Sequence, residues 1–268
     1  MNRKWTSRGK QWRLLLAAMM VLFLGIGPGV ANAGEEEQPM SAVEWPDVSG
    51  EWRLDVVSVA QSRIPVVGEV QTTTRSVLKV RLEQRGSQVE LVGTTESIQV
   101  ESSTSMVRTI IPERFVRSVK EVRRRGELRR SGDGYELFFP RHWEVQGARL
   151  SDPAREALPQ EPGDRRVYDQ DGDGNPGVTV RVEGVVSGSL YVVQRGWDEW
   201  RFTIPGDGEF EEARGTLVWD MEQVILGATS RFLRKQPETR PDRSRSYVQI
   251  RRLSAVQGVR TGEGRMAS

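Results

Sequence analysis

The chain has 268 residues, of which 39 are Lys or Arg and 37 are Asp or Glu, and it contains one histidine and no cysteine. The lack of cysteine excludes disulfide bonds, a thiol nucleophile, thiolate metal sites and the lipid-modified cysteine of bacterial lipoproteins. A single histidine likewise excludes a metal site built from several imidazoles.

The first 33 residues have the pattern of a secretory signal peptide. Five basic residues precede an apolar segment over residues 14–26, and the small residues 31–33 follow it. The apolar segment is shorter than the roughly 20 residues that span a bilayer, which favours a cleaved leader over the alternative of a membrane anchor. Cleavage after Ala33 would release a periplasmic or secreted protein without a transmembrane segment.

Cleavage would also change the charge of the chain. The leader holds five of the 39 basic residues and no acidic residue, so the mature protein has 34 basic against 37 acidic residues, a net charge of −3. Nucleic-acid backbones bind to net basic surfaces. The sequence therefore predicts no nucleic-acid partner.

The remaining chain divides into a leader, one domain and a tail. Residues 34–44 are polar and without periodicity, which indicates a flexible leader. Residues 45–253 are enough for a single β-barrel domain with a sizeable core, interrupted by a loop insertion over residues 151–177. Residues 254–268 show neither a helical nor a strand period, and we expect them to be disordered.

Apolar residues alternate with polar ones along most of this domain, as half-buried strands require. The alternation is clear at residues 52–56, 78–82, 89–91, 98–100, 115–119, 135–139, 178–182, 200–204, 217–221 and 248–250. Glycine-containing turn signals at residues 85–87, 131–134 and 205–208 favour hairpins between several of these segments. The predicted fold is all-β, an antiparallel meander barrel of about 8–10 strands, with a β-sandwich as the alternative.

Two short helices are also predicted in connections between strands. In residues 151–158, Asp152 is placed to cap the first turn, Pro153 suits the first helical position and Pro159 ends the segment. Residues 228–235 are the second candidate, and Pro237 follows them.

The start of the domain, Gly50-Glu51-Trp52, resembles the Gly-x-Trp opening of the first strand in lipocalins and other calycin barrels. The resemblance implies a lipocalin-like barrel in which Trp52 plugs one end. The chain lacks the Thr-Asp-x-x-Tyr motif of lipocalins and their long helix before the final strand, so the resemblance covers only the first strand and the all-β plan. A core aromatic residue without ligand contact is the simpler interpretation of Trp52.

The segment with the most specific spacing is an acidic, glycine-rich loop. Asp169, Asp171 and Asp173 stand at alternate positions, Gly174 follows, and Asn175 is placed to offer its backbone carbonyl. Several oxygens that converge on one point are what Ca²⁺ requires. The loop resembles the Asp-x-Asp-x-Asp-Gly calcium loops of dockerins, thrombospondin-type repeats and many exported bacterial β-proteins.

The loop departs from an EF-hand at its twelfth position, where Val180 replaces the bidentate glutamate. The missing ligands would come from water or from carboxylates such as Glu183 and Asp164. A plain polar turn is the alternative, but three converging aspartates repel one another without a cation. We therefore predict a structural Ca²⁺ held by the three aspartates and Asn175.

No catalytic or cofactor-binding residue is assigned from the sequence. His142 is the one imidazole, and neither a nucleophile elbow nor a phosphate-binding glycine loop occurs. Trp197 and Trp200 flank two acidic residues in a segment that suits sugar stacking, although a hairpin with two core tryptophans is the simpler interpretation. Carboxylate pairs meet in space rather than in sequence, so a carbohydrate- or lipid-active hydrolase stays the alternative function.

The stretch between Arg114 and Arg130 holds the largest concentration of basic charge. A solvated strand face is the simplest interpretation, and a barrel mouth that attracts an anionic ligand is the sharper one. Together these patterns predict an exported, non-catalytic, calcium-stabilised binding or envelope-associated module. Its expected ligand is small and either apolar or anionic.

Overall fold

The computed structural model describes residues 44–64, 67–235 and 237–253. The predicted signal peptide, nearly all of the predicted leader and the predicted tail lie outside the described residues. The strands are β1 (Gly50–Ile64), β2 (Gly68–Arg85), β3 (Gln88–Ser102), β4 (Val107–Ile110), β5 (Val122–Ser131), β6 (Gly134–Gln146), β7 (Val178–Gly184), β8 (Gly188–Ile204), β9 (Glu212–Ala228), β10 (Glu238–Pro241) and β11 (Tyr247–Arg252). The described part also contains a short helix, α1 (Glu113–Ser118), and a 3₁₀ turn, η1 (Arg231–Leu233).

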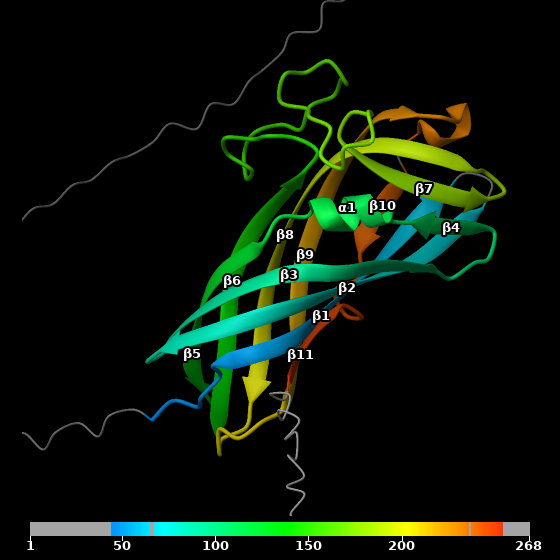
Figure 1. Ribbon diagram of the computed structural model, residues 1–268. Helices are drawn as coiled ribbons and strands as arrows, with labels where there is room; N and C mark the ends of the chain where they lie inside the picture. The colour runs from blue at the N-terminus through cyan, green and yellow to red at the C-terminus, as the bar shows by residue number, and fades with distance from the viewer. Residues whose placement is uncertain (1–43, 65–66, 236, 254–268) are drawn as a thin grey trace, which may run out of the picture. The chain divides into compact units, whose positions relative to one another are not determined.

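The strands pair into one antiparallel sheet that closes on itself. The closed ring follows the order β8, β6, β5, β3, β2, β1, β11 and β9, and β9 pairs again with β8. β7 and β4 extend the sheet beyond β8, and β10 pairs with β1. In Figure 1, β1, β2 and β3 run across the steeper strands β6, β8 and β9. The prediction of an all-β antiparallel fold is confirmed.

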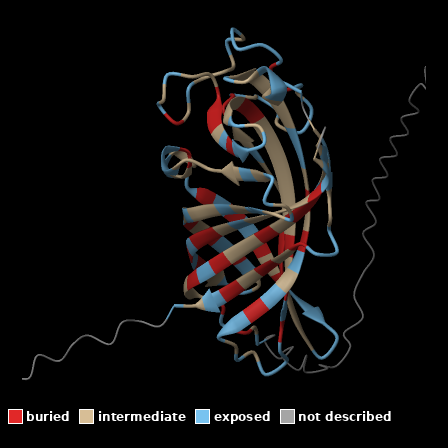
Figure 2. Ribbon diagram, turned by 90° about the vertical axis from the view of Figure 1, so that its right-hand side faces the viewer, coloured by how far each residue is buried: buried red, intermediate tan, exposed pale blue. Residues whose placement is uncertain are grey.

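The main core lies inside the ring. Along β1, Trp52 and Leu54 are buried while Arg53 between them is exposed, which is the alternation that the sequence shows. Figure 2 shows buried positions alternating with exposed and intermediate ones along the strands. Phe139 of β6 contacts Trp200 and Phe202 of β8 edge-on, with ring centres 5.8 and 6.5 Å apart. Each fully buried large apolar side chain contributes roughly 1.5–3 kcal/mol.

Each of the three predicted turns lies in a connection between two strands that pair as a hairpin. Residues 86–87 join β2 to β3, residues 132–133 join β5 to β6, and residues 205–211 join β8 to β9. Gly86 and Gly132 have φ angles of +60° and +56°, a conformation that glycine adopts without strain.

Two smaller apolar clusters attach the segments outside the ring. Phe115 of α1 packs against Val178 of β7 and Val192 of β8. In the connection between β6 and β7, Leu158 packs in a cluster with Val193 of β8. Both α1 and the connection are therefore held against the β7–β8 part of the sheet.

The prediction of a strand at residues 115–119 is wrong, because Glu113–Ser118 form α1. Pro112 precedes the helix in extended conformation, and Phe115 is its buried residue. Phe115 and Val119 are four residues apart, a spacing that also places two apolar side chains on one face of a helix. The apolar residues of so short a segment therefore fit both the period of a strand and that of a helix.

The first predicted helix, over residues 151–158, is wrong, and the second is shorter than expected. The Glu156 carboxylate accepts hydrogen bonds from the backbone nitrogens of Ser151 (2.7 Å) and Asp152 (3.3 Å), and the Asp152 carboxylate accepts from Ala154 N (3.0 Å). Such local side-chain bonds favour a turn over a continued helix. In residues 228–235, the three residues of η1 are the helical part.

Candidate functional site

The acidic loop lies in the connection from β6 to β7 and is closed at its base. A parallel bridge joins Asp169 to Gly177, with Gln170 N donating to the Gly177 carbonyl (2.9 Å) and Gly177 N donating to the Tyr168 carbonyl (3.0 Å). Gly177 has a φ of +84°, and a Cβ there would lie 2.2 Å from the Val192 carbonyl oxygen. Only glycine fits this position, which holds the loop against β8.

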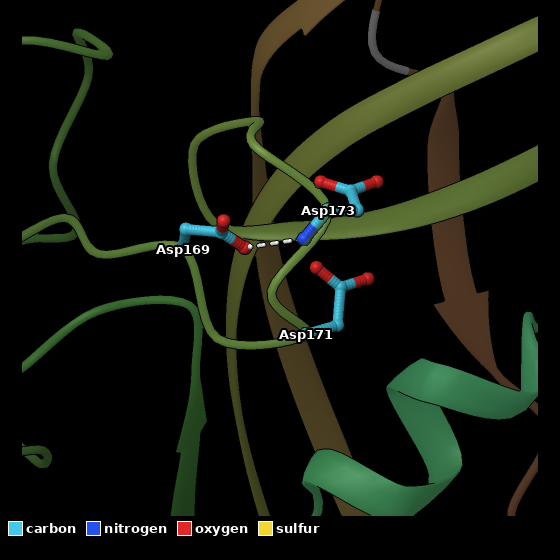
Figure 3. A group of neighbouring side chains, drawn as sticks. All are labelled: Asp169, Asp171 and Asp173. Carbon is cyan, nitrogen blue, oxygen red and sulfur yellow. Dashed lines mark hydrogen bonds between the residues drawn. The ribbon is translucent and has the colours of Figure 1, made fainter.

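Asp169 folds the loop around its own carboxylate. That carboxylate accepts hydrogen bonds from the backbone nitrogens of Gly172 (2.8 Å), Asp173 (3.2 Å) and Gly174 (2.8 Å), and Figure 3 draws the bond from Asp173. Gly174 has a φ of +86°, which lets the chain turn sharply after Asp173. The aspartate and glycine spacing therefore shapes the loop before any ligand is considered.

Asp171 is the buried member of the group. It is 8 % exposed, and its Oδ2 accepts a hydrogen bond from Thr179 N (3.1 Å). Its Oδ1 is buried and has no hydrogen-bond partner among the described residues. Burial raises the pKa of Asp171, and the charges of Asp173 and Asp169 raise it further, against the Thr179 hydrogen bond that lowers it. A buried acceptor without a donor is destabilising, so this oxygen favours a positively charged partner.

Both carboxylate oxygens of Asp173 accept hydrogen bonds, unlike those of Asp171. Its Oδ1 accepts from the backbone N (2.9 Å) and side-chain Nδ2 (3.0 Å) of Asn175, and its Oδ2 accepts from the Thr179 hydroxyl (2.6 Å). Burial alone would raise the pKa of Asp173, but the hydrogen bonds from Thr179 and Asn175 outweigh it, and the net shift is downward. Asn175 thus lies at the site, and its role as a carbonyl ligand stays a prediction.

The three aspartates lie close enough to share one cation. Each offers an oxygen such that the three oxygens lie within 4.8 Å of one another, and Ca²⁺ binds oxygens at about 2.3–2.6 Å. Figure 3 shows the three carboxyl groups gathered around the middle of the loop. Within the described residues, neither Asp164 nor Glu183 joins this group. Asp164 is instead held by Arg166 (2.7 Å), whose hydrogen bonds lower the pKa of Asp164 to about 2.

The loop is also bonded to α1, which lies beside it in Figure 3. Arg114 Nη1 donates to the Gly172 carbonyl (3.1 Å), and Gln170 Nε2 donates to the carbonyl and hydroxyl of Ser118 (both 3.4 Å). Both ends of α1 are therefore hydrogen-bonded to the loop.

A second charged cluster, which the sequence does not reveal, lies inside the ring. The Arg124 side chain of β5 is 3 % exposed and donates from Nη1 to Asp198 Oδ1 of β8 (2.6 Å). Its Nη2 donates to the carbonyls of Asp198 (3.0 Å) and Pro140 (3.1 Å), and the guanidinium lies 3.6 Å from the centre of the Trp200 ring. Burial lowers the pKa of Arg124, and the Asp198 carboxylate offsets part of that effect.

His142 and Glu144 share this inner face. In the β6–β8 register His142 lies opposite Asp198 and Glu144 lies opposite Gly196, so their side chains point to the side that Asp198 occupies. Burial, followed by the charge of Arg124, lowers the pKa of His142. Loss of hydration, followed by the charge of Asp198, raises the pKa of Glu144. The Glu144 residue is nevertheless exposed, so it borders solvent-accessible space rather than packed core.

A cavity opens beside this cluster, where β5 and β6 separate. Their paired residues end at Glu127 and Phe138, and β6 shifts register between Phe139 and His142. The shifted segment contains Pro140, which has no N–H to continue a ladder. The cavity has a volume of about 410 Å³ and is lined by Glu90, residues 123–125 and residues 140–142.

The structure separates the members of the basic stretch and also the two tryptophans. On β5, Arg124 faces inward and is buried, whereas Arg123 and Arg125 are exposed. Trp197 and Trp200 lie in the middle of β8, which forms antiparallel hairpins with β7 and β9. Trp200 lies in the core, whereas Trp197 lies beside Trp143 of β6 with ring centres 6.4 Å apart.

No protein family matches the sequence, and neither a curated protein nor a solved structure matches it. Within the residues that the structure describes, no helix is long and apolar enough to cross a membrane. The function is therefore inferred from the geometry of the loop and the ring.

Proposed function

We propose that this chain is an exported, non-catalytic binding module with a lipocalin-like barrel, which a Ca²⁺ ion at Asp169, Asp171, Asp173 and Asn175 stabilises. The observation that carries the proposal is the buried Asp171 Oδ1, which has no partner among the described residues although two other carboxylates lie beside it. A divalent cation supplies that partner and removes the repulsion between the three carboxylates. Oxygen-only ligands favour Ca²⁺ over softer metals.

The closed strand ring supports the barrel part of the proposal. Trp52 is fully buried, its indole N donates to the Val48 carbonyl (2.9 Å), and Phe210 stacks on it at 5.2 Å. The Arg252 guanidinium lies 4.2 Å from the centre of the Trp52 ring. A tryptophan enclosed in this way is suited to the plugging role that the resemblance to lipocalins implies.

The calcium part of the proposal is tested by thermal unfolding of the mature protein with Ca²⁺ and with a chelator. At a few times Kd, Ca²⁺ contributes about 1 kcal/mol, which raises the Tm of a domain of this size by about 2–4 °C. Asp171→Asn should abolish the difference between the two curves. Asp207→Asn, a change of the same kind in an exposed turn, should keep it. Equal midpoints for folded wild-type protein in both buffers would overturn the proposal.

The export part is tested separately by mass spectrometry of the native protein. A chain that begins at Gly34 in the periplasm or the medium is expected. A chain that retains Met1 or the apolar segment 14–26 in the cytoplasm contradicts it.

A hydrolase is the second candidate function, and the inner carboxylates favour it. Asp198 is held by Arg124, while Glu144 on the neighbouring strand has a raised pKa. Two carboxyl groups with such different surroundings are the arrangement in which one acts as base and the other as acid. The test is turnover of glycoside and ester substrates by the mature protein. Activity that Glu144→Gln removes, in a variant that remains folded, would replace the non-catalytic proposal.

A further inference from the structure

The cavity between β5 and β6 is a surface site with a defined physical origin. The two strands separate because the β6 bulge at Pro140 ends their ladder, and Arg124 Nη2 bonds the Pro140 carbonyl that the ladder leaves free (3.1 Å). Arg124, which lines the cavity, is thus held in place by Asp198 and by the Pro140 carbonyl. Lining residues that are already fixed are typical of a preformed binding site.

The exposed lining of this cavity is strongly basic. Arg123, Arg125 and Arg141 are all exposed, and Glu90 is the one acidic residue in the lining. Asp198 already neutralises Arg124. Arg123 has an ion-pair partner in Glu121 (2.7 Å), while no ion pair is found for Arg125 or Arg141 among the described residues.

Two of these side chains are held in place. The Arg141 guanidinium lies 3.7 Å from the centre of the Trp197 ring, and the Glu121 carboxylate fixes Arg123. A guanidinium that is already oriented loses less conformational entropy when it binds an oxyanion. Arginine forks match the oxygen pairs of phosphate groups.

We propose that this cavity binds the phosphate group of a small molecule or of a lipid headgroup. The inference rests on the proposed binding function and specifies its ligand class. Arg125 and Arg141 supply positive charge for an oxyanion, and a volume of about 410 Å³ admits a phosphate group with part of the molecule that carries it. The site is separate from the acidic loop, since none of its lining residues belongs to that loop.

The test is isothermal titration calorimetry of the mature protein with inorganic phosphate, in buffer without added calcium. We expect saturable binding that weakens as the salt concentration rises. The double variant Arg125→Gln with Arg141→Gln should bind at least ten-fold more weakly. Arg85→Gln combined with Arg130→Gln is the matched control, because it removes two arginine charges from exposed positions outside the cavity lining, and it should bind as the wild type does.

Vesicles distinguish the two sources of the phosphate group. A lipid headgroup is the ligand if the wild-type protein sediments with phosphatidylglycerol vesicles but not with phosphatidylcholine vesicles, and if the double variant does not sediment with either. Saturable binding of inorganic phosphate without vesicle binding identifies a soluble phosphate compound. Absence of both, or binding that the double variant retains, overturns the inference. The calcium-dependent Tm shift is measured separately, so its presence or absence leaves this result unaffected.

Discussion

Asp198→Asn is the substitution that tests the inner ion pair most directly. It keeps the size of the side chain and one oxygen acceptor, and it removes the negative charge that faces Arg124. Arg124 is 3 % exposed, so solvent does not replace the lost charge, and a guanidinium stays protonated at neutral pH. Removal of one partner of a buried ion pair costs about 3–5 kcal/mol.

Three features of the structure reduce the expected loss below that range. The Asp198 carboxylate is 28 % exposed, so the pair is not fully buried. The carbonyls of Asp198 and Pro140 still accept hydrogen bonds from Arg124, and the new amide offers an oxygen to Nη1. We therefore expect the free energy of unfolding to fall by about 2–3 kcal/mol, which lowers Tm by about 4–12 °C.

Urea unfolding at pH 7 measures this loss as a lower midpoint with an unchanged slope. Glu113→Gln is the matched control, because it makes the same carboxylate-to-amide change in an exposed pair with Arg117, and such pairs contribute about 0.5 kcal/mol. Adding Arg124→Met to Asp198→Asn should regain about 1 kcal/mol, since no unpaired buried charge remains. The reasoning is refuted if Asp198→Asn unfolds like the control, or if the double variant is less stable than the single one.

Three further predictions follow from the loop and α1. The pKa of Asp171 in the fold is raised above its ordinary value of 3.8, so the calcium-free fold loses stability as pH rises from 3.8 through the raised pKa. Protons compete with Ca²⁺ for this carboxylate, so the Ca²⁺-induced Tm shift should shrink as pH falls through the same range. A Tm shift that stays constant from pH 7 to pH 4 contradicts this prediction. Gly177→Ala combines a positive φ with a clash against the Val192 carbonyl and should cost about 2–3 kcal/mol in urea unfolding, whereas Gly163→Ala, where a Cβ meets open space, should be neutral. Phe115→Ala should cost about 3 kcal/mol because Phe115 is 4 % exposed, and Phe232→Ala, at a side chain that is 68 % exposed, should change stability by less than about 0.5 kcal/mol.

The strands were predictable because the period of two extends over long segments. Trp52 and Leu54 of β1, or Phe202 and Ile204 of β8, are buried on one face as the alternation indicates. The order of the strands in the ring was not predictable, because the pairing of β1 with β11 joins strands at opposite ends of the domain. β5 also lacked a clear signal, since Arg124 and Gly126 occupy two of its inward positions.

The acidic loop was predictable for a different reason. Its aspartates stand at alternate positions within five residues of the chain, and the same spacing that suits a cation also makes the hydrogen bonds from Gly172 and Gly174 to Asp169. The ion pair between Arg124 and Asp198 joins residues 74 positions apart, and each residue alone looks like an ordinary surface charge. One signal in the sequence was available, Pro140 inside a strand, because proline cannot continue a ladder of hydrogen bonds.

The bonds to α1 give the loop a role beyond closing the connection from β6 to β7. Arg114 and Gln170 join the loop to the two ends of α1, and Phe115 between them packs on Val178 and Val192. Gly172 lies between Asp171 and Asp173, so repulsion between the carboxylates would strain the segment that Arg114 bonds. A cation bound there as proposed would relieve that repulsion and help to hold α1 on the β7–β8 part of the sheet. The proposed Ca²⁺ would then stabilise the packing of α1 as well as the loop, a structural role separate from the ligand binding proposed for the basic cavity.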